Sequence, residues 1–293
     1  MRTSIHKSIL EVSDFKNQLL QWSQQFREVV FLDSNAAINA NLNKYSTYDC
    51  VLAVDALTSI KTDFHNAFED LKTVQQTTRD WLFGYLTYDL KNDTENLKSN
   101  NFDGLGFPDL YFFQPKKIFL LKENQLEIQY LNLCDDEVET DFEEIINGQK
   151  PIVESYEPIN IQQRISKEVY LEKVNSMLAK IHRGDIYEAN FCMEFFAENT
   201  SITSKRFVDA IKDENSKKNL ENDPKERSEN IMIVDLVRND LSHTAEKGSV
   251  QVEELCGIYS FKQVHQMIST IVSKVAHTIS PVEILKTTFP MGS

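Results

Sequence analysis

The sequence predicts a globular protein in which helices and strands are mixed along the chain. Hydrophobic residues make up 41% and charged residues 26% of the 293 residues, which is ordinary for a globular protein. Several segments carry apolar residues at helical spacing, while others are short apolar or alternating runs typical of strands. Two apolar runs, 117–121 and 126–130, flank the polar residues 122–125 and predict a β-hairpin.

The first half of the chain is predicted to contain two helices and several strands. Apolar residues between Phe15 and Phe26 recur at helical spacing after Ser13-Asp14, a candidate cap. A second, short helix is predicted around residues 64–71, with Thr62 or Asp63 as its cap. Further strands are predicted at residues 29–32, 48–54 and 81–88, and residues 92–106 are polar and predicted to form a loop.

The best candidate boundary in the chain lies near residue 150. An acidic segment, residues 135–156, contains Gln149-Lys150-Pro151 at this point. We therefore predict two regions, residues 1–150 and residues 151–293. Both contain predicted strands, so the boundary is not expected to be a hinge.

The second region is predicted to contain three helices. The first is capped by Ser166 and ends at Gly184. The second begins at Asp223-Pro224, where Asp caps and Pro takes the first helical position. It runs to about Leu241, and it is apolar on most sides at residues 231–234, so we expect it to be buried. Strands are predicted at 186–196, 248–255 and 264–275, and a last helix begins at Ser280-Pro281.

Composition excludes several classes of function. The formal net charge of −14 disfavours binding to nucleic acid, because an acidic surface repels phosphate backbones. The four cysteines are far apart and form no CxxC pair, so neither a zinc site nor a disulfide framework is indicated. No signal peptide and no membrane span are recognised in the sequence, and we expect a cytoplasmic protein.

Two carboxylates and one histidine are the strongest candidates for chemistry. Glu226 and Glu229 lie three residues apart on one face of the predicted helix, where they could hold a cation such as Mg²⁺. A solvated face near a helix N-terminus explains the same spacing. His265 lies in a predicted strand and could position a substrate or transfer a proton. A histidine that is half-buried for packing alone is the competing interpretation.

Taken together, several segments resemble the component I family of anthranilate synthase and aminodeoxychorismate synthase. That family also includes isochorismate and salicylate synthases. The resemblance is carried by GDIYEANF at 184–191, ERSENIMIVDLVRNDL at 226–241, VHQM at 264–267 and FPMGS at 289–293. In the first half, FGYLTYD at 83–89 and PDL at 108–110 resemble the aminodeoxychorismate branch, and Leu32-Asp33-Ser34 resembles a stretch that forms part of a tryptophan pocket in relatives.

The resemblance implies a fold and a set of site residues. The implied fold is α+β, with two antiparallel sheets packed as a sandwich and helices outside. Glu229 would match a ligand of the cofactor Mg²⁺ and Glu226 a nearby acidic partner, while His265 would lie beside the ring of chorismate. Gly292 and Ser293 would match residues near the bound substrate. Ser34 would match a tryptophan-site residue, although a plain turn residue is an equally good interpretation.

The implied function is the conversion of chorismate and ammonia to 4-amino-4-deoxychorismate, a precursor of folate. A glutamine amidotransferase partner would supply the ammonia. The alternatives are an anthranilate synthase component I and a relative that binds chorismate or tryptophan without catalysis. Family segments containing SPERF, PIKGT and the block after FPGGS have no counterpart here, and the PIKGT segment would have decided between the two products. These segments are rich in glycine, and this sequence has only eight glycines, so we expect it to omit stretches of a longer chain.

Overall fold

The chain forms two compact units. The computed structural model describes residues 1–34, 47–95, 97, 102–148, 160–186, 189–198, 220–261 and 265–291. One unit is made of residues 1–151 and 211–293, and the other of residues 152–210. The first unit therefore combines segments from both ends of the sequence.

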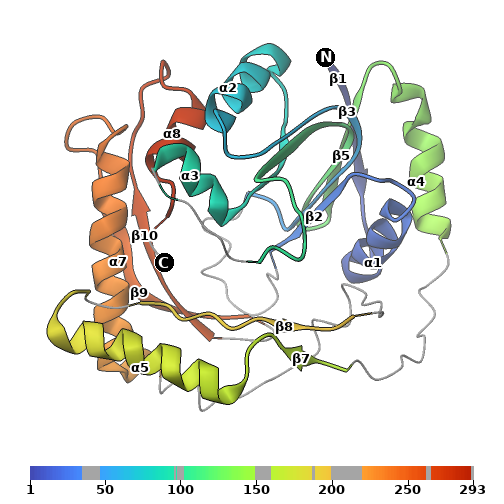
Figure 1. Ribbon diagram of the computed structural model, residues 1–293. Helices are drawn as coiled ribbons and strands as arrows, with labels where there is room; N and C mark the ends of the chain where they lie inside the picture. Colours follow the sequence, from blue (N-terminus) through green and yellow to red (C-terminus); the bar gives the residue numbers. More distant parts are fainter. Residues whose placement is uncertain are drawn as a thin grey trace. The chain divides into compact units, whose positions relative to one another are not determined.

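The first unit contains a six-stranded antiparallel sheet (Figure 1). Five strands lie in the order β1-β6-β5-β3-β2, and β4 pairs with one end of β5. The predicted hairpin is confirmed, because β5 and β6 are consecutive, antiparallel and joined at Lys122 and Gln125. The strands are β1 (Arg2–Ser8), β2 (Val29–Asp33), β3 (Cys50–Thr62), β4 (Phe83–Leu86), β5 (Leu110–Lys122) and β6 (Gln125–Leu131).

Alternation along the strands divides the core between the two faces of this sheet. Leu52 and Phe119 belong to a buried cluster that also contains Phe15 and Leu19 of α1 (Val12–Ser23) and Ile145 of α4 (Val138–Asn147). The short 3₁₀ turn η3 (Asp135–Glu137) leads into α4. The strand neighbours of Leu52 and Phe119 point to the opposite face of the sheet, because successive side chains of a strand alternate. On that face lies a second buried cluster, made of Ala53, Phe83, Phe113, Ile118 and Leu120.

A third cluster joins the last helix of the chain to the first half. Val282 of α8 (Pro281–Thr287) is buried with Phe68 and Leu71 of α2 (Ala67–Thr78). Ala67, Leu90 at the end of η2 (Tyr88–Leu90) and Leu110 also belong to this cluster. The single turn α3 (Lys91–Thr94) follows η2. Helix α8 is therefore held against residues 67–110 by apolar packing within one unit.

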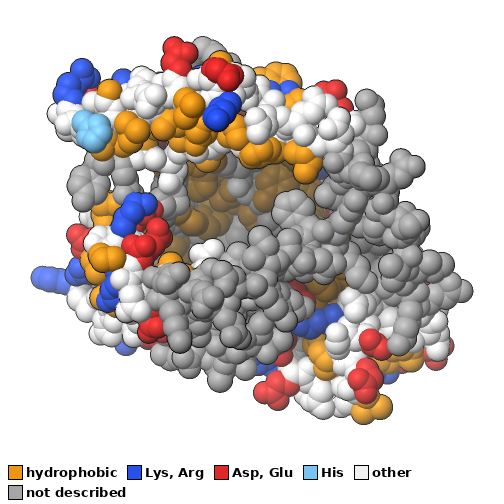
Figure 2. Space-filling model, turned by 90° about the horizontal axis from the view of Figure 1, so that it is seen from below, with side chains coloured by type: hydrophobic (Ala, Val, Ile, Leu, Met, Phe, Trp, Pro, Cys, Tyr) orange, Lys and Arg blue, Asp and Glu red, His pale blue; other side chains and the backbone are white. Residues whose placement is uncertain are grey.

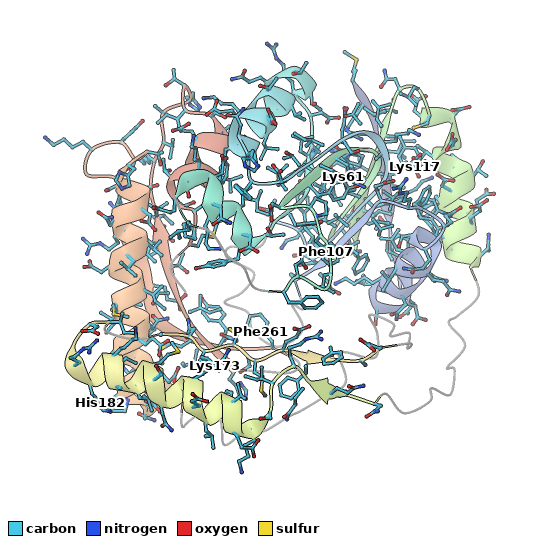
Figure 3. The ribbon with its side chains drawn as sticks, in the orientation of Figure 1. Lys61, Phe107, Lys117, Lys173, His182 and Phe261 are labelled. Atoms are coloured by element: carbon cyan, nitrogen blue, oxygen red, sulfur yellow. The ribbon has the colours of Figure 1, made fainter. Side chains whose placement is uncertain are left out.

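One lysine is buried between the sheet and a helix. Lys117 of β5 is 4% exposed and lies on the side of α4 (Figure 3). Its Nζ lies 2.6 Å from a carboxylate oxygen of Asp141 and 2.6 Å from one of Glu137. The hydroxyl of Tyr130 donates to the same Asp141 oxygen at 2.7 Å. The charge of Lys117 is thus compensated by two carboxylates, as a buried charge requires.

Near the end of the sequence, one helix packs against a pair of strands. Helix α7 (Pro224–Ser242) lies beside β9 (Gln251–Ser260) and β10 (His265–Val272), which form a two-stranded antiparallel sheet (Figure 1). The start of α7 is as predicted: Asp223 caps it and accepts hydrogen bonds from the backbone N–H groups of Lys225 and Glu226, and Pro224 takes the first position.

The second unit contains α5 (Lys167–Arg183) and a short antiparallel pair, β7 (Gln162–Gln163) and β8 (Phe195–Phe196). Both predicted ends of α5 are confirmed, because Ser166 caps its start and Gly184 ends it with a φ of 86°. Arg164 and Glu194 form a two-bond ion pair with N–O distances of 2.9 Å. Hydrophobic side chains are exposed along this helix (Figure 2).

Two predicted caps are wrong. Helix α1 begins at Val12, with Glu11 in the cap position, so Ser13 and Asp14 lie inside its first turn. Helix α2 begins at Ala67, and neither Thr62 nor Asp63 caps it. Its N–H groups at Asn66 and Phe68 instead donate to the carboxylate of Asp93, at 2.9 and 3.1 Å. A cap from 25 residues away leaves no local sequence signal.

Two other expectations also fail. Helix α7 is not buried on most sides: Val234 is its only buried residue, while Ile231 is 46% and Leu236 49% exposed. The reason is that one face of α7 packs on β9 and β10. In the predicted strand at 186–196, the described residues 189–194 are not in a strand, and pairing is limited to Phe195 and Phe196. Every helix in the described ranges is too short or too polar to span a lipid bilayer.

Candidate functional site

The helix α7 presents two carboxylates toward the strand β10. Because Glu226 and Asn230 are four residues apart and Glu229 lies between them, the three side chains fall on one face of the helix. On β10, His265 and Met267 are two residues apart, so their side chains point to the same side of the strand. The structure therefore brings together the three residues that the sequence analysis singled out for chemistry: Glu226, Glu229 and His265.

These residues line a cavity of about 300 Å³. Four of its lining residues come from α7 and three from β10. The complete lining among the described residues is Leu220, Glu226, Glu229, Asn230, Ile233, His265, Gln266 and Met267. A second cavity of about 290 Å³ lies further along the same helix and strand, and Asn230 and Ile233 line both.

The two carboxylates are half-exposed and have one cationic neighbour in common. The side chain of Glu226 is 45% exposed and that of Glu229 is 30% exposed. Lys225 Nζ lies 4.0 Å from an oxygen of each, but its own side chain is 82% exposed. An ion pair this open contributes little, because water and salt screen it.

The donor set fits a magnesium ion better than a transition metal. In the described part of the chain, no group of three or more His, Cys, Asp or Glu residues could hold a metal ion by itself. Mg²⁺ commonly binds through one or two carboxylates and completes its six oxygen ligands with water and substrate. Glu226 and Glu229 supply two carboxylates at the wall of one cavity, whereas a structural zinc site would need four protein ligands.

His265 is held by a hydrogen bond across the strand pair. Ser260 of β9 is its direct partner in the register, and the Ser260 hydroxyl lies 2.8 Å from Nδ1 of His265. Ser260 is buried, with 6% of its surface exposed. A hydrogen bond at Nδ1 orients the imidazole ring and influences which nitrogen carries the proton.

Asn230 was not predicted from the sequence, although its side chain forms hydrogen bonds to both neighbouring strands. Its Nδ2 donates to the backbone carbonyl of Met267 at 3.2 Å, and its Oδ1 accepts hydrogen bonds from the Ser269 hydroxyl and, at 3.5 Å, the Cys256 thiol. The only sequence signal for Asn230 was its position, because a polar amide directly precedes the apolar run 231–234.

The remaining predicted site residues lie away from this cavity or outside the residues that the structure describes. Ser34 is not among the residues that line the cavity, and its hydroxyl donates to the backbone carbonyl of Asp49 at 3.1 Å. This contact suits a turn residue, and a role in tryptophan binding stays a prediction. Gly292 and Ser293 lie outside the described residues.

Comparison with known proteins identifies a family whose model matches most of the chain. The family model described as chorismate binding enzyme matches residues 15–212 and 203–293. Over 179 residues the chain is 28% identical to aminodeoxychorismate synthase component 1 of Klebsiella aerogenes, which covers 44% of this chain and 40% of that protein. Over 91 residues it is 42% identical to anthranilate synthase component 1 of Bacillus subtilis, covering 31% of this chain and 18% of that protein.

A solved structure shares the fold. Anthranilate synthase component I from Streptococcus pneumoniae aligns with a TM-score of 0.66 at 18% identity, covering 83% of this chain and 72% of that one. The predicted α+β class with antiparallel sheets is confirmed by this likeness and by the strand pairings. The chain spans about 40% of the length of the Klebsiella relative.

Proposed function

This chain belongs to the chorismate binding enzyme family, and we propose that it is an aminodeoxychorismate synthase component I. The proposed reaction joins chorismate and ammonia to give 4-amino-4-deoxychorismate and water, for the synthesis of para-aminobenzoate and folate. The observation that carries the proposal is the cavity that gathers Glu226, Glu229 and His265. The Klebsiella relative, named aminodeoxychorismate synthase component 1, supports the choice of product.

Each of the three residues has a role in this proposal. Glu226 and Glu229 would hold Mg²⁺, which supplies positive charge for a carboxylate of the substrate. His265 would lie beside the ring, where it orients the substrate and handles a proton. In the overall change a C–N bond forms on the ring, a C–O bond breaks, and the hydroxyl leaves as water with acid assistance. A glutamine amidotransferase subunit would supply the ammonia.

Anthranilate synthase component I is the second candidate. The 42% identity over 91 residues to the Bacillus subtilis protein of that name favours it. The two functions share chorismate and an ammonia source, and they differ in the product. The sequence motifs FGYLTYD and PDL in the first half favour the aminodeoxychorismate branch.

Turnover of chorismate distinguishes the candidates. Purified full-length protein is incubated with chorismate, Mg²⁺ and ammonium, and the products are separated by chromatography. Aminodeoxychorismate supports the first function and fluorescent anthranilate the second. Absence of any chorismate consumption would count against both.

A substitution at the carboxylate pair tests the metal assignment. We expect Glu229→Gln to lower activity by about 100-fold or more, because losing several kcal/mol of charge stabilisation corresponds to that factor. Asp235→Asn is the matched control, since Asp235 lies on the same helix, is 78% exposed and pairs with Arg238. A Glu229→Gln protein with full activity would remove Glu229 from the site.

A further inference from the structure

Asn230 connects α7 to both strands of the neighbouring sheet. Its amide nitrogen reaches the carbonyl of Met267 on β10, two residues from His265. Its amide oxygen accepts from Ser269 on β10 and from the thiol of Cys256 on β9. The Asn230 side chain thus contacts the strand that carries His265. Asn230 also directly follows Glu229 in the sequence.

The place where Asn230 binds is a break in the strand register. Ile268 pairs with Gly257 and Thr270 pairs with Glu254, so two residues of β9, Leu255 and Cys256, stand opposite Ser269. Cys256 has a φ of 55°, a left-handed conformation that a side chain adopts at a cost. Bulges of this kind are often found beside active sites, where they change the direction of a side chain.

Polar contacts hold this bulge together. The backbone N–H of Cys256 donates to the Ser269 hydroxyl at 2.8 Å, and the Ser269 hydroxyl donates to Asn230. The N–H that the bulge removes from the strand ladder is therefore satisfied through Ser269, and Ser269 is in turn fixed by α7. Cys256, Ser269 and Asn230 thus link β9, β10 and α7 in one hydrogen-bond network.

Apolar packing alone would not define the position of α7 along β10. Ile233, Val234 and Val237 contribute apolar contacts beside the second cavity, but such contacts are not directional. Hydrogen bonds have narrow limits of distance and angle, so they fix a register. A slip by one helical turn would move Glu226 and Glu229 by about 5.4 Å relative to His265.

We propose that Asn230 is a positioning residue that fixes the carboxylate of Glu229 relative to His265. It acts together with Ser269 and the bulge at Cys256. The inference rests on the proposed metal-binding role of Glu229, and it adds a residue that acts through that glutamate. Residues of this kind, which orient metal ligands, typically affect metal affinity by about 10- to 100-fold.

Metal binding without substrate tests this role. Mn²⁺ serves as a paramagnetic probe, and its binding to the full chain is followed by electron paramagnetic resonance. We expect Asn230→Ala to weaken Mn²⁺ binding by about 10-fold or more. Ser269→Ala removes the same network from the strand side and should act in the same direction. Asn239→Ala is the matched control, because Asn239 is an exposed asparagine on the same helix.

A double variant separates positioning from general stability. If Asn230 acts through Glu229, then Asn230→Ala combined with Glu229→Gln should bind Mn²⁺ no more weakly than Glu229→Gln alone. Additive losses, or unchanged Mn²⁺ binding in folded Asn230→Ala and Ser269→Ala proteins, would overturn the inference alone. Unchanged Mn²⁺ binding in Glu229→Gln would overturn both the inference and the metal site on which it rests.

Discussion

The buried lysine between β5 and α4 gives the sharpest prediction for stability. Lys117→Met keeps an apolar stem but removes the charge that compensates Asp141, which is 9% exposed. It also removes a cation that lies 5.2 to 5.8 Å from the ring centres of Tyr130, Phe26 and Trp22. Removing one partner of a buried ion pair costs about 3–5 kcal/mol of unfolding free energy. Urea denaturation measures this cost.

The neighbouring lysine is the control for this measurement. Lys116 lies 3.1 Å from Asp55, but both side chains are about 30% exposed, at 28% and 31%. Lys116→Met should therefore cost no more than about 1 kcal/mol. If Lys117→Met cost as little as Lys116→Met, the carboxylates of Asp141 and Glu137 would not depend on Lys117, and the reasoning would fail.

The dependence of this cost on pH has a definite sign. Burial lowers the pKa of Lys117, but its hydrogen bonds to Asp141 and Glu137 outweigh burial and raise the pKa above its usual value. A group whose pKa is raised on folding stabilises the protein below its unfolded pKa, about 10.4 for lysine, and loses this contribution as the pH rises through the folded pKa. The difference between wild type and Lys117→Met should therefore shrink above about pH 10.4. A difference that grows there would contradict the assignment.

Two further substitutions test local structure. Asp223→Ala removes the cap of α7 and should lower the unfolding free energy by about 1 kcal/mol, measured by urea denaturation; no loss would show that the cap is not needed. Gly84→Ala should prevent stable folding, because the new Cβ would lie 1.9 Å from the carbonyl oxygen of Tyr111 on the paired strand β5. Circular dichroism of the purified variant checks this, and a native spectrum with unchanged stability would contradict the close approach.

The fold was predictable where the sequence signals are local. The hairpin of β5 and β6, the Ser166 and Gly184 ends of α5, and the Asp223-Pro224 start of α7 all depend on residues within a few positions. The start of α2 was not predictable in this way, because its cap is Asp93. The burial of α7 was overestimated, because composition reports how apolar a helix is and not how many of its faces are covered.

The candidate site was predictable to a similar degree. Residue type and spacing made Glu226, Glu229 and His265 candidates, the resemblance of 226–241 and 264–267 to family motifs selected them, and the fold places them around one cavity. Asn230, Ser260 and Ser269 were missed because their roles come from contacts between α7, β9 and β10, which are set by the register of two strands and one bulge. Polar side chains that position other residues in this way do not recur at a fixed spacing in the sequence, so no pattern identifies them.

Charge provides a further test of the proposed function. The chain carries a formal net charge of −14, and the cavity adds two carboxylates where an anionic substrate would bind. Lys225 Nζ lies 4.0 Å from an oxygen of each glutamate, and its side chain is 82% exposed. The dielectric constant of water therefore applies, and the attraction between Lys225 and each carboxylate is only about 1 kcal/mol. Chorismate should therefore bind much more weakly when divalent cations are removed. Calorimetric titration with chorismate in Mg²⁺ and in EDTA measures this, at matched ionic strength. Equal affinity in the two buffers would mean that another part of the chain supplies the positive charge, and that Glu226 and Glu229 do not act through a metal.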